Sequence, residues 1–471
     1  MAAFVKIYLI LLLEIIIYLF TELKGLDIDY TTCYRVNMIC LIICTIIFFS
    51  YLFKKKGDIF SPIFIFTILY IFMFFIAPMY DIYNKNYLWF GVNLFDYGVK
   101  GSLIALLGYI SFYFFYINGS NQKSDNKNIK EILNKKNHQI FIFLGYFICL
   151  LANIFYLVKN NGNSILYVLT LGALGSGGVN EKLSNIGLIS MLSYCLPSFT
   201  LLYLEYGRKN KIVKFIIFMI MLELQVARGF RFFIVQIAIM FGFYYFLRNN
   251  RKIKFSSILI FGMLLMIPIF LMTVFRNSIR SGEGIDLSII SFEILQEAFD
   301  AAFWENLRIY KTYYGIIKAV PKMTDYLFGK QMIIYTMIMF IPRAIWKEKP
   351  GNPGTKAQEL GINEVAVKSG SAYPCLGEYY YECGILGVIF CMSFFGWGMK
   401  NLQNKYRFEA KSKVDLMIYT TIVGTILQLV IRGYTPSNFW MIIFSMLPFW
   451  IMKKFFMRKI KYEQINKKLY V

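Results

Sequence analysis

Charged side chains are scarce in this sequence. Only 16% of its 471 residues are Asp, Glu, Lys or Arg, whereas 58% are hydrophobic. A soluble globular protein carries about 25% charged and about 45–50% apolar residues, so this composition excludes an ordinary water-soluble fold. The sequence therefore predicts a protein that resides in a lipid bilayer.

Residues that commonly hold metal ions are also few. The chain has one histidine, His138, and eight cysteines that form no Cys-x-x-Cys pair and lie mostly inside apolar runs. Zinc and iron–sulfur sites need clustered ligands, and secreted disulfide frameworks need spaced cysteine pairs. We therefore expect no metal site, no cofactor and no disulfide framework.

Long apolar runs account for most of the chain. A helix needs about 17–25 residues to cross the hydrocarbon core, and slightly fewer where it stops short of one surface. The sequence predicts an all-α polytopic membrane protein, with residues 1–471 forming one integral membrane domain. We expect about twelve transmembrane helices, near residues 3–20, 37–53, 59–78, 101–118, 140–158, 188–204, 215–227, 230–247, 255–274, 385–399, 416–431 and 439–452.

The basic excess of the chain is distributed unevenly among its loops. Of a formal net charge of +23, most falls on alternate loops and on the C-terminal tail, which together hold 28 Lys and Arg against 7 acidic residues. Cytoplasmic loops collect Lys and Arg, so this side is predicted to be the cytoplasm, with both termini there. The membrane topology accounts for the net positive charge, so no nucleic-acid partner is needed to explain it. The basic face also suits anionic membrane lipids.

One loop on the opposite, extracytoplasmic side spans residues 275–384. It is too long for an ordinary connection and too rich in aromatic residues for a solvated linker. Apolar residues recur at helical spacing over 287–320, which predicts an amphipathic helix. Residues 331–345 are apolar for too short a distance to span, and are expected to form an interfacial or re-entrant segment.

Charged residues also interrupt an apolar stretch at 215–247. Glu223, Arg228 and Arg231 lie there between two short apolar runs, which suggests a turn below the membrane surface beside a water-filled cavity. Arginine facing lipid costs several kcal/mol, so Arg228 and Arg231 are candidate functional residues. The alternative is that Glu223 pairs with one arginine and merely holds the hairpin together.

Further cations are predicted at the outer face. Arginine grips phosphate oxygens through two donors at once, so a group of them around a membrane cavity suits a lipid-linked diphosphate. Each alone is equally compatible with an ordinary interfacial cation. The candidates for diphosphate binding are Arg228, Arg231, Arg276, Arg280, Arg343, Lys349 and Arg432.

Two glutamates precede the tenth predicted span. Glu378 and Glu382 are four residues apart and would share one face of a helix at the membrane surface. A carboxylate in this position can accept a proton from a sugar hydroxyl, which makes Glu378 the candidate catalytic residue. The alternative is a structural carboxylate that ties down arginine or backbone donors.

Three short motifs resemble the oligosaccharide repeat-unit polymerases of O-antigen and capsule synthesis, the Wzy-type membrane glycosyltransferases. The motifs are a Gly-x-Arg turn, a Phe-Gly-Lys sequence followed by Pro-Arg-x-x-Trp-x-x-Lys-Pro, and a Gly-Glu-x-Tyr sequence followed by Gly-x-x-Gly. They correspond to residues 229–231, 328–330 with 342–350, and 377–387. Their order and their placement in the predicted topology also fit this family.

The resemblance implies a GT-C-like fold and a polymerase of the bacterial cytoplasmic membrane. Such an enzyme moves a growing glycan from undecaprenyl diphosphate onto the next lipid-linked oligosaccharide repeat unit, for O-antigen, capsule or exopolysaccharide. A flippase and a chain-length regulator of the same pathway are implied partners. Departing diphosphate charge can be stabilised by Arg and Lys, so we expect catalysis without a metal ion.

Two alternatives keep the membrane fold. A glycan ligase would use another acceptor, but the related ligases are associated with an outer-face histidine, and His138 is predicted to be cytoplasmic. A lipid-linked oligosaccharide flippase or other transporter would place polar residues near the midplane of two related halves. The single long outer loop favours an enzyme that works at the membrane surface.

Overall fold

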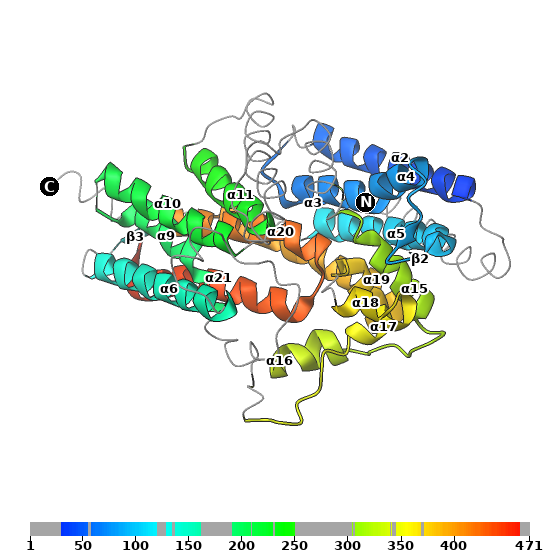
Figure 1. Ribbon diagram of the computed structural model, residues 1–471. Coiled ribbons are helices and arrows are strands. Elements are labelled where there is room, and N and C mark those ends of the chain that lie inside the picture. The colour runs from blue at the N-terminus through cyan, green and yellow to red at the C-terminus, as the bar shows by residue number, and fades with distance from the viewer. Residues whose placement is uncertain are drawn as a thin grey trace, which may run out of the picture.

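The computed structural model describes residues 30–54, 58–119, 129–133, 137–161, 191–208, 210–228, 231–249, 304, 307–339, 341, 345–368 and 372–461. The architecture in these ranges is a bundle of long helices with a set of short helices at one end (Figure 1). The predicted spans 3–20 and 255–274 lie outside the described residues.

Seven helices of the described part are long and apolar enough to cross a membrane. This finding confirms a mostly helical, polytopic membrane protein. The seven are α2 (Tyr30–Lys54), the continuous run α3 (Pro62–Ile71), η1 (Phe72–Ile76) and α4 (Ala77–Tyr83), then α5 (Gly98–Asn118), α6 (His138–Asn161), α19 (Cys375–Gln403) with η6 (Asn404–Phe408), α20 (Lys413–Ile431) and α21 (Thr435–Phe456).

Three shorter helices occupy the middle of the chain: α9 (Cys195–Tyr206), α10 (Lys211–Ala227) and α11 (Arg231–Arg248). At 1.5 Å per residue, the 17-residue α10 rises only about 25 Å, so it falls short of a hydrocarbon core of about 30 Å. Helix α10 ends at Ala227 and α11 begins at Arg231, so the helix boundaries coincide with the predicted break between 227 and 230.

The long predicted loop contains helices in its described part. These are α15 (Tyr310–Ala319), η5 (Lys330–Tyr335), α16 (Thr336–Ile338), α17 (Thr355–Gly361) and α18 (Glu364–Lys368). The segment η5–α16 is too short to span and leaves apolar side chains such as Ile333 and Met337 exposed, as expected for an interfacial segment. Helix α19 begins ten residues before the predicted span, and its backbone breaks at Cys383 and Gly384, where Gly384 has φ +62°.

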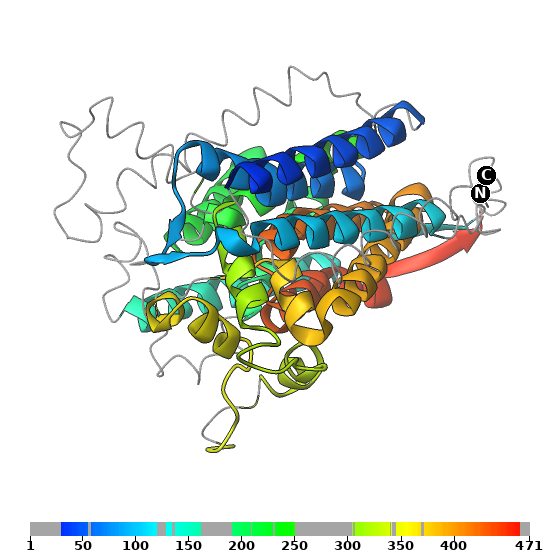
Figure 2. The ribbon, with the colours of Figure 1, turned by 90° about the vertical axis from the view of Figure 1, so that its right-hand side faces the viewer.

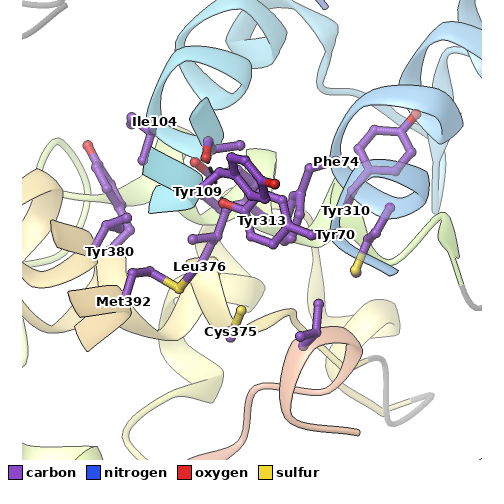
Figure 3. Close-up of a cluster of buried hydrophobic side chains, with 14 of the residues drawn as sticks. Tyr70, Phe74, Ile104, Tyr109, Tyr310, Tyr313, Cys375, Leu376, Tyr380 and Met392 are labelled. Carbon is purple, nitrogen blue, oxygen red and sulfur yellow. Dashed lines mark hydrogen bonds between the residues drawn. The ribbon is translucent and has the colours of Figure 1, made fainter. Parts of the chain in front are cut away.

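The hydrophobic core lies around α5 and α20. Of the central apolar stretch in each of these helices, 78% is buried, against 28% in α2 and α6, so the latter two lie at the periphery. Gly396 lets α19 approach α5 closely, because a Cβ there would lie 2.2 Å from the carbonyl oxygen of Phe112. Tyrosines fill the core near α15 (Figure 3), where the hydroxyl of Tyr313 donates to the carbonyl of Gly101 at 3.1 Å.

The opposite end of the bundle carries a two-stranded antiparallel sheet. Strand β3 (Ile129–Leu133) pairs with β4 (Met457–Lys461), with Leu133 opposite Met457 (Figure 2). A second antiparallel pair, β1 (Leu88–Trp89) and β2 (Val92–Asn93), lies beside α15. Helix α20 starts at the β3–β4 end with a capping box, in which Ser412 and Asp415 satisfy each other's backbone N–H groups.

Candidate functional site

Arg228 is buried at the C-terminal end of α10. Only 5% of the residue is exposed, and its guanidinium carbon lies 4.4 Å from the ring centre of Phe233 and 4.8 Å from that of Tyr194. Among the described residues, the side chain makes one hydrogen bond, from Nη1 to Gln225 Oε1 at 3.5 Å, and its Nε has no partner. A buried cation without a counter-ion is costly, so this group is suited to receive an anion.

The alternative partner for this arginine is Glu223. Glu223 is exposed, and the ion pairs among the described residues include none between it and Arg228. The aromatic rings of Tyr156, Tyr194 and Phe233 surround the guanidinium instead, through cation–π contacts. In the described residues, the hairpin is therefore not held by a Glu223–Arg228 pair.

Arg432 also lies beside the first turn of α11. It caps the C-terminus of α20, and its guanidinium carbon lies 5.4 Å from the ring centre of Phe232. Phe232 and Phe233 are neighbours in the first turn of α11, which itself begins at Arg231. Two of the predicted cations, Arg228 and Arg432, which are far apart in sequence, thus place their guanidinium groups at this turn, and the backbone of a third, Arg231, begins it. We refer to Arg228, Arg231 and Arg432 as the α11 arginine cluster.

The other predicted cations are placed differently. Lys349 donates from Nζ to the carbonyl oxygens of Met339 at 2.6 Å and Ile341 at 3.1 Å, so it closes the loop that follows α16. The side chain of Arg231 lies outside the described part of the structure, as do the whole of Arg276, Arg280 and Arg343. Their predicted roles stay predictions.

Glu378 lies in the first turn of α19 and is 1% exposed. Its carboxylate accepts hydrogen bonds from Gln331 Nε2 at 2.8 Å, from the backbone N–H of Thr435 at 2.9 Å and from the Thr435 hydroxyl at 2.6 Å. One carboxylate thereby joins α19 to η5 and to the start of α21. These contacts are those of a residue that orients its neighbours.

The turn formed by residues 432–435 connects Glu378 to the α11 arginine cluster. Thr435 follows Arg432 by three residues, and the intervening Gly433 donates its N–H to the carbonyl of Tyr373 at 2.9 Å. A Cβ at Gly433 would lie 2.2 Å from the Cα of Cys375, so this turn packs directly on the first residue of α19. Glu378 therefore fixes the turn that carries Arg432.

Glu382 holds the same loop segment one helical turn later. Its carboxylate accepts from the backbone N–H of Met332 at 2.8 Å and from the N–H of Gly329. Both bonds satisfy amides at the start of η5, which have no partners inside the helix. Both predicted glutamates therefore face the same segment, because Glu378 binds Gln331 and Glu382 binds Gly329 and Met332.

Clusters of His, Cys, Asp and Glu that could hold a metal ion are absent from the described residues. His138 begins α6 and is 7% exposed. A further charged cluster, at Asp81, Arg308 and Lys311, was not singled out from the sequence. The available signal was an acidic residue shortly after an apolar run, which calls for a cationic partner elsewhere in the chain.

Comparison with known proteins gives one informative match. The family model for O-antigen polysaccharide polymerase Wzy matches residues 2–460, almost the whole chain. No curated protein and no solved structure matches this chain significantly. The matched region includes the arginine cluster, both glutamates and the helices that position them.

Proposed function

The chain belongs to the O-antigen polysaccharide polymerase Wzy family, and we propose that it joins lipid-linked oligosaccharide repeat units at the outer face of the membrane. Membership and the apolar helices make it a multi-pass protein of the bacterial inner membrane with a role in O-antigen synthesis. In the proposed reaction, the growing glycan leaves undecaprenyl diphosphate and is attached to a sugar hydroxyl of the next lipid-linked unit. Capsule or exopolysaccharide synthesis would use the same chemistry.

The α11 arginine cluster carries this proposal. When the glycosidic bond to the carrier breaks, negative charge develops on the diphosphate, and cations that already face that position lower the barrier. Arg228 is buried without a described counter-ion and Arg432 lies over the same helical turn, so both are suited to this task. We propose that Arg231, Arg276, Arg280, Arg343 and Lys349 complete the cationic surroundings, without a divalent metal.

Glu378 is proposed to act on the acceptor side. As a general base it would take the proton of the attacking sugar hydroxyl, and as an orienting residue it would place the neighbouring groups that bind substrate. Its four hydrogen-bond contacts with Gln331 and Thr435 support the orienting role more strongly. Through Thr435 this role extends to Arg432 and hence to the diphosphate site.

The topology behind this proposal has about twelve spans in a GT-C-like arrangement. We propose that both termini and the β3–β4 end face the cytoplasm and that residues 275–384 face outward. Ion pairs at the β3–β4 end join helices across its basic loops: Arg248 and Lys413 both bind Glu205, at 2.8 and 2.6 Å. The polymerase would receive its substrate from a flippase and respond to a chain-length regulator of the same pathway.

The state of the lipid carrier in a deletion strain tests the proposal. A missing polymerase leaves undecaprenyl diphosphate with single repeat units at the outer face, open to externally added glycosidase. Complementation with the wild-type gene should restore long polymer. Repeats protected inside the cell would indicate a flippase, and finished polymer retained on the carrier would indicate a ligase; either result contradicts the proposed function.

A further inference from the structure

Asp81 is a fully buried acceptor that joins several donors near the end of α4. The residue is 0% exposed, and its Oδ1 accepts from Arg308 Nε at 3.0 Å and from Asn86 at 3.3 Å. Its Oδ2 accepts from the Tyr310 hydroxyl at 2.8 Å and forms an ion pair with Lys311 at 3.0 Å. One carboxylate thus faces two cations, and the cluster carries a surplus of one positive charge.

Lys311 has no donor left to offer. Its ammonium is fully buried and contacts three acceptors: Asp81, the carbonyl of Asn86 at 2.6 Å and the carbonyl of Leu88 at 3.3 Å. An ammonium has three N–H donors, so all of them are engaged. Of the two cations, only Arg308 can therefore offer N–H donors to an anionic ligand.

Asp81 holds one edge of the Arg308 guanidinium, and none of the described residues binds the other edge. Asp81 binds its Nε, while its Nη groups make no hydrogen bond to any residue that the structure describes, and 22% of the side chain is exposed. The ring centres of Tyr80 and Trp304 are stacked 3.9 Å apart, and the backbone carbonyl of Trp304 accepts a hydrogen bond from the backbone N–H of Arg308. A guanidinium oriented by a buried carboxylate presents its remaining donors in a fixed direction.

Arg308 and the α11 arginine cluster lie in different parts of the bundle. Arg228 contacts α11 and an aromatic residue of α6, whereas Arg308 contacts α4 and precedes α15. Figure 1 shows α4 and α15 on the opposite side of the molecule from α6 and α10. Both sites nevertheless belong to the same end, because α15 packs on the start of α19, where Ile316 meets Gly377.

We propose that Arg308 forms a second anion site, which holds the diphosphate of a second lipid-linked molecule. The inference rests on the proposed function: polymerisation joins two lipid-linked glycans, and each of them brings a diphosphate into the enzyme. One cationic site serves one diphosphate, so two are needed at once. The α11 arginine cluster supplies one site and the open edge of Arg308 the other.

The count of bound carrier molecules tests this proposal. Purified protein is titrated with undecaprenyl diphosphate, and with undecaprenol as a reference without phosphate, and the complexes are counted by native mass spectrometry. Wild-type protein should bind two diphosphates, and Arg308→Gln should bind one, with at least about a tenfold loss of affinity for the second. Lys322→Gln, which removes an exposed charge shortly after α15, should still bind two.

A second variant distinguishes loss of the anion site from loss of the fold. Arg308→Lys keeps the ion pair with Asp81 but lacks the planar fork, so it should remain in the membrane and also lose the second diphosphate. Three results would overturn the second site alone. They are two diphosphates bound to both Arg308 variants, only one bound to the wild type, and undecaprenol that occupies the second site as well as the diphosphate does. A wild-type protein that binds no diphosphate would overturn the proposed function as well.

Discussion

Glu378 and Thr435 are joined through both the backbone and the side chain of the threonine. The N–H of Thr435 lies 2.9 Å from Glu378 Oε1, and the Thr435 hydroxyl donates to Oε2 at 2.6 Å. Arg432 lies three residues earlier on the same turn, with its guanidinium over Phe232. A carboxylate on α19 thus sets the position of an arginine on α20.

This relationship predicts that Thr435→Val impairs polymerisation. Valine keeps the shape of threonine but removes the hydroxyl that binds Glu378, and loss of a donor to a buried carboxylate costs about 1–3 kcal/mol. If Glu378 acts through the turn, the variant should polymerise about tenfold more slowly while remaining in the membrane. Normal chain growth in this variant would instead favour a direct role for Glu378 as base.

Glu378→Gln should be more severe than Thr435→Val. The amide that replaces one oxygen brings N–H donors toward Thr435 or Gln331, which are themselves donors. We expect polymerisation at least tens of times slower, with unchanged protein in the membrane, as judged by chain length on gels. Full activity of this variant would show that neither base catalysis nor orientation depends on the carboxylate.

The close contact of α5 and α19 gives a prediction about stability. Gly396→Ala places a methyl group 2.2 Å from the Phe112 carbonyl oxygen, and overpacking of this kind costs about 1–3 kcal/mol. Gly398 is the matched control on the same helix, because nothing lies within 4 Å of a Cβ there. Thermal unfolding in detergent should show a lower midpoint for Gly396→Ala and an unchanged or higher one for Gly398→Ala, because alanine favours a helix more than glycine does. Equal midpoints for the two variants would contradict the packing.

The proposed orientation predicts which loops can be labelled from outside. A single cysteine introduced at Lys356, in α17, should react with a membrane-impermeant maleimide in intact spheroplasts. A cysteine at Lys411, next to the start of α20, should react only after the membrane is opened. Labelling of position 411 from outside would reverse the assignment of the two ends.

Metal removal provides a further prediction. The charge on the departing diphosphate is assigned to arginine and lysine side chains, so the purified enzyme should remain active in the presence of a chelator. The measurement is the rate of polymer formation with and without EDTA. Activity that stops with chelator and returns with Mg²⁺ or Mn²⁺ would require a metal in the reaction.

The sequence predicted the helical membrane architecture because hydropathy and loop charge are local properties. Seven of the predicted spans coincide with long helices, and the break before Arg231 was visible as charged residues between apolar runs. The early start of α19 at Cys375 was missed because its first two turns are rich in Glu and Tyr rather than aliphatic residues. They are buried by contacts with α15 and η5, which the local sequence does not reveal.

The candidate site was predictable in its residue types but not in its connections. Arg228, Arg432 and Glu378 were recognisable as charged residues where the bilayer disfavours them. Their convergence depends on the packing of α20 against α11 and on Gly433, whose contact with Cys375 appears only in three dimensions. Asp81 and Lys311 are separated by more than two hundred residues, so the sequence did not indicate which cation pairs with Asp81.

The central claim is that the α11 arginine cluster binds the diphosphate through guanidinium groups that offer two donors at once. The most direct measurement is polymer formation by purified protein from lipid-linked single repeats, comparing Arg228→Lys, Arg231→Lys and Arg432→Lys with the exposed control Arg208→Lys. Lysine keeps the charge but loses the fork, so each cluster variant should fall at least about tenfold and accumulate unextended carrier, while the control stays normal. Polymer of normal amount and length from all three cluster variants would contradict the account.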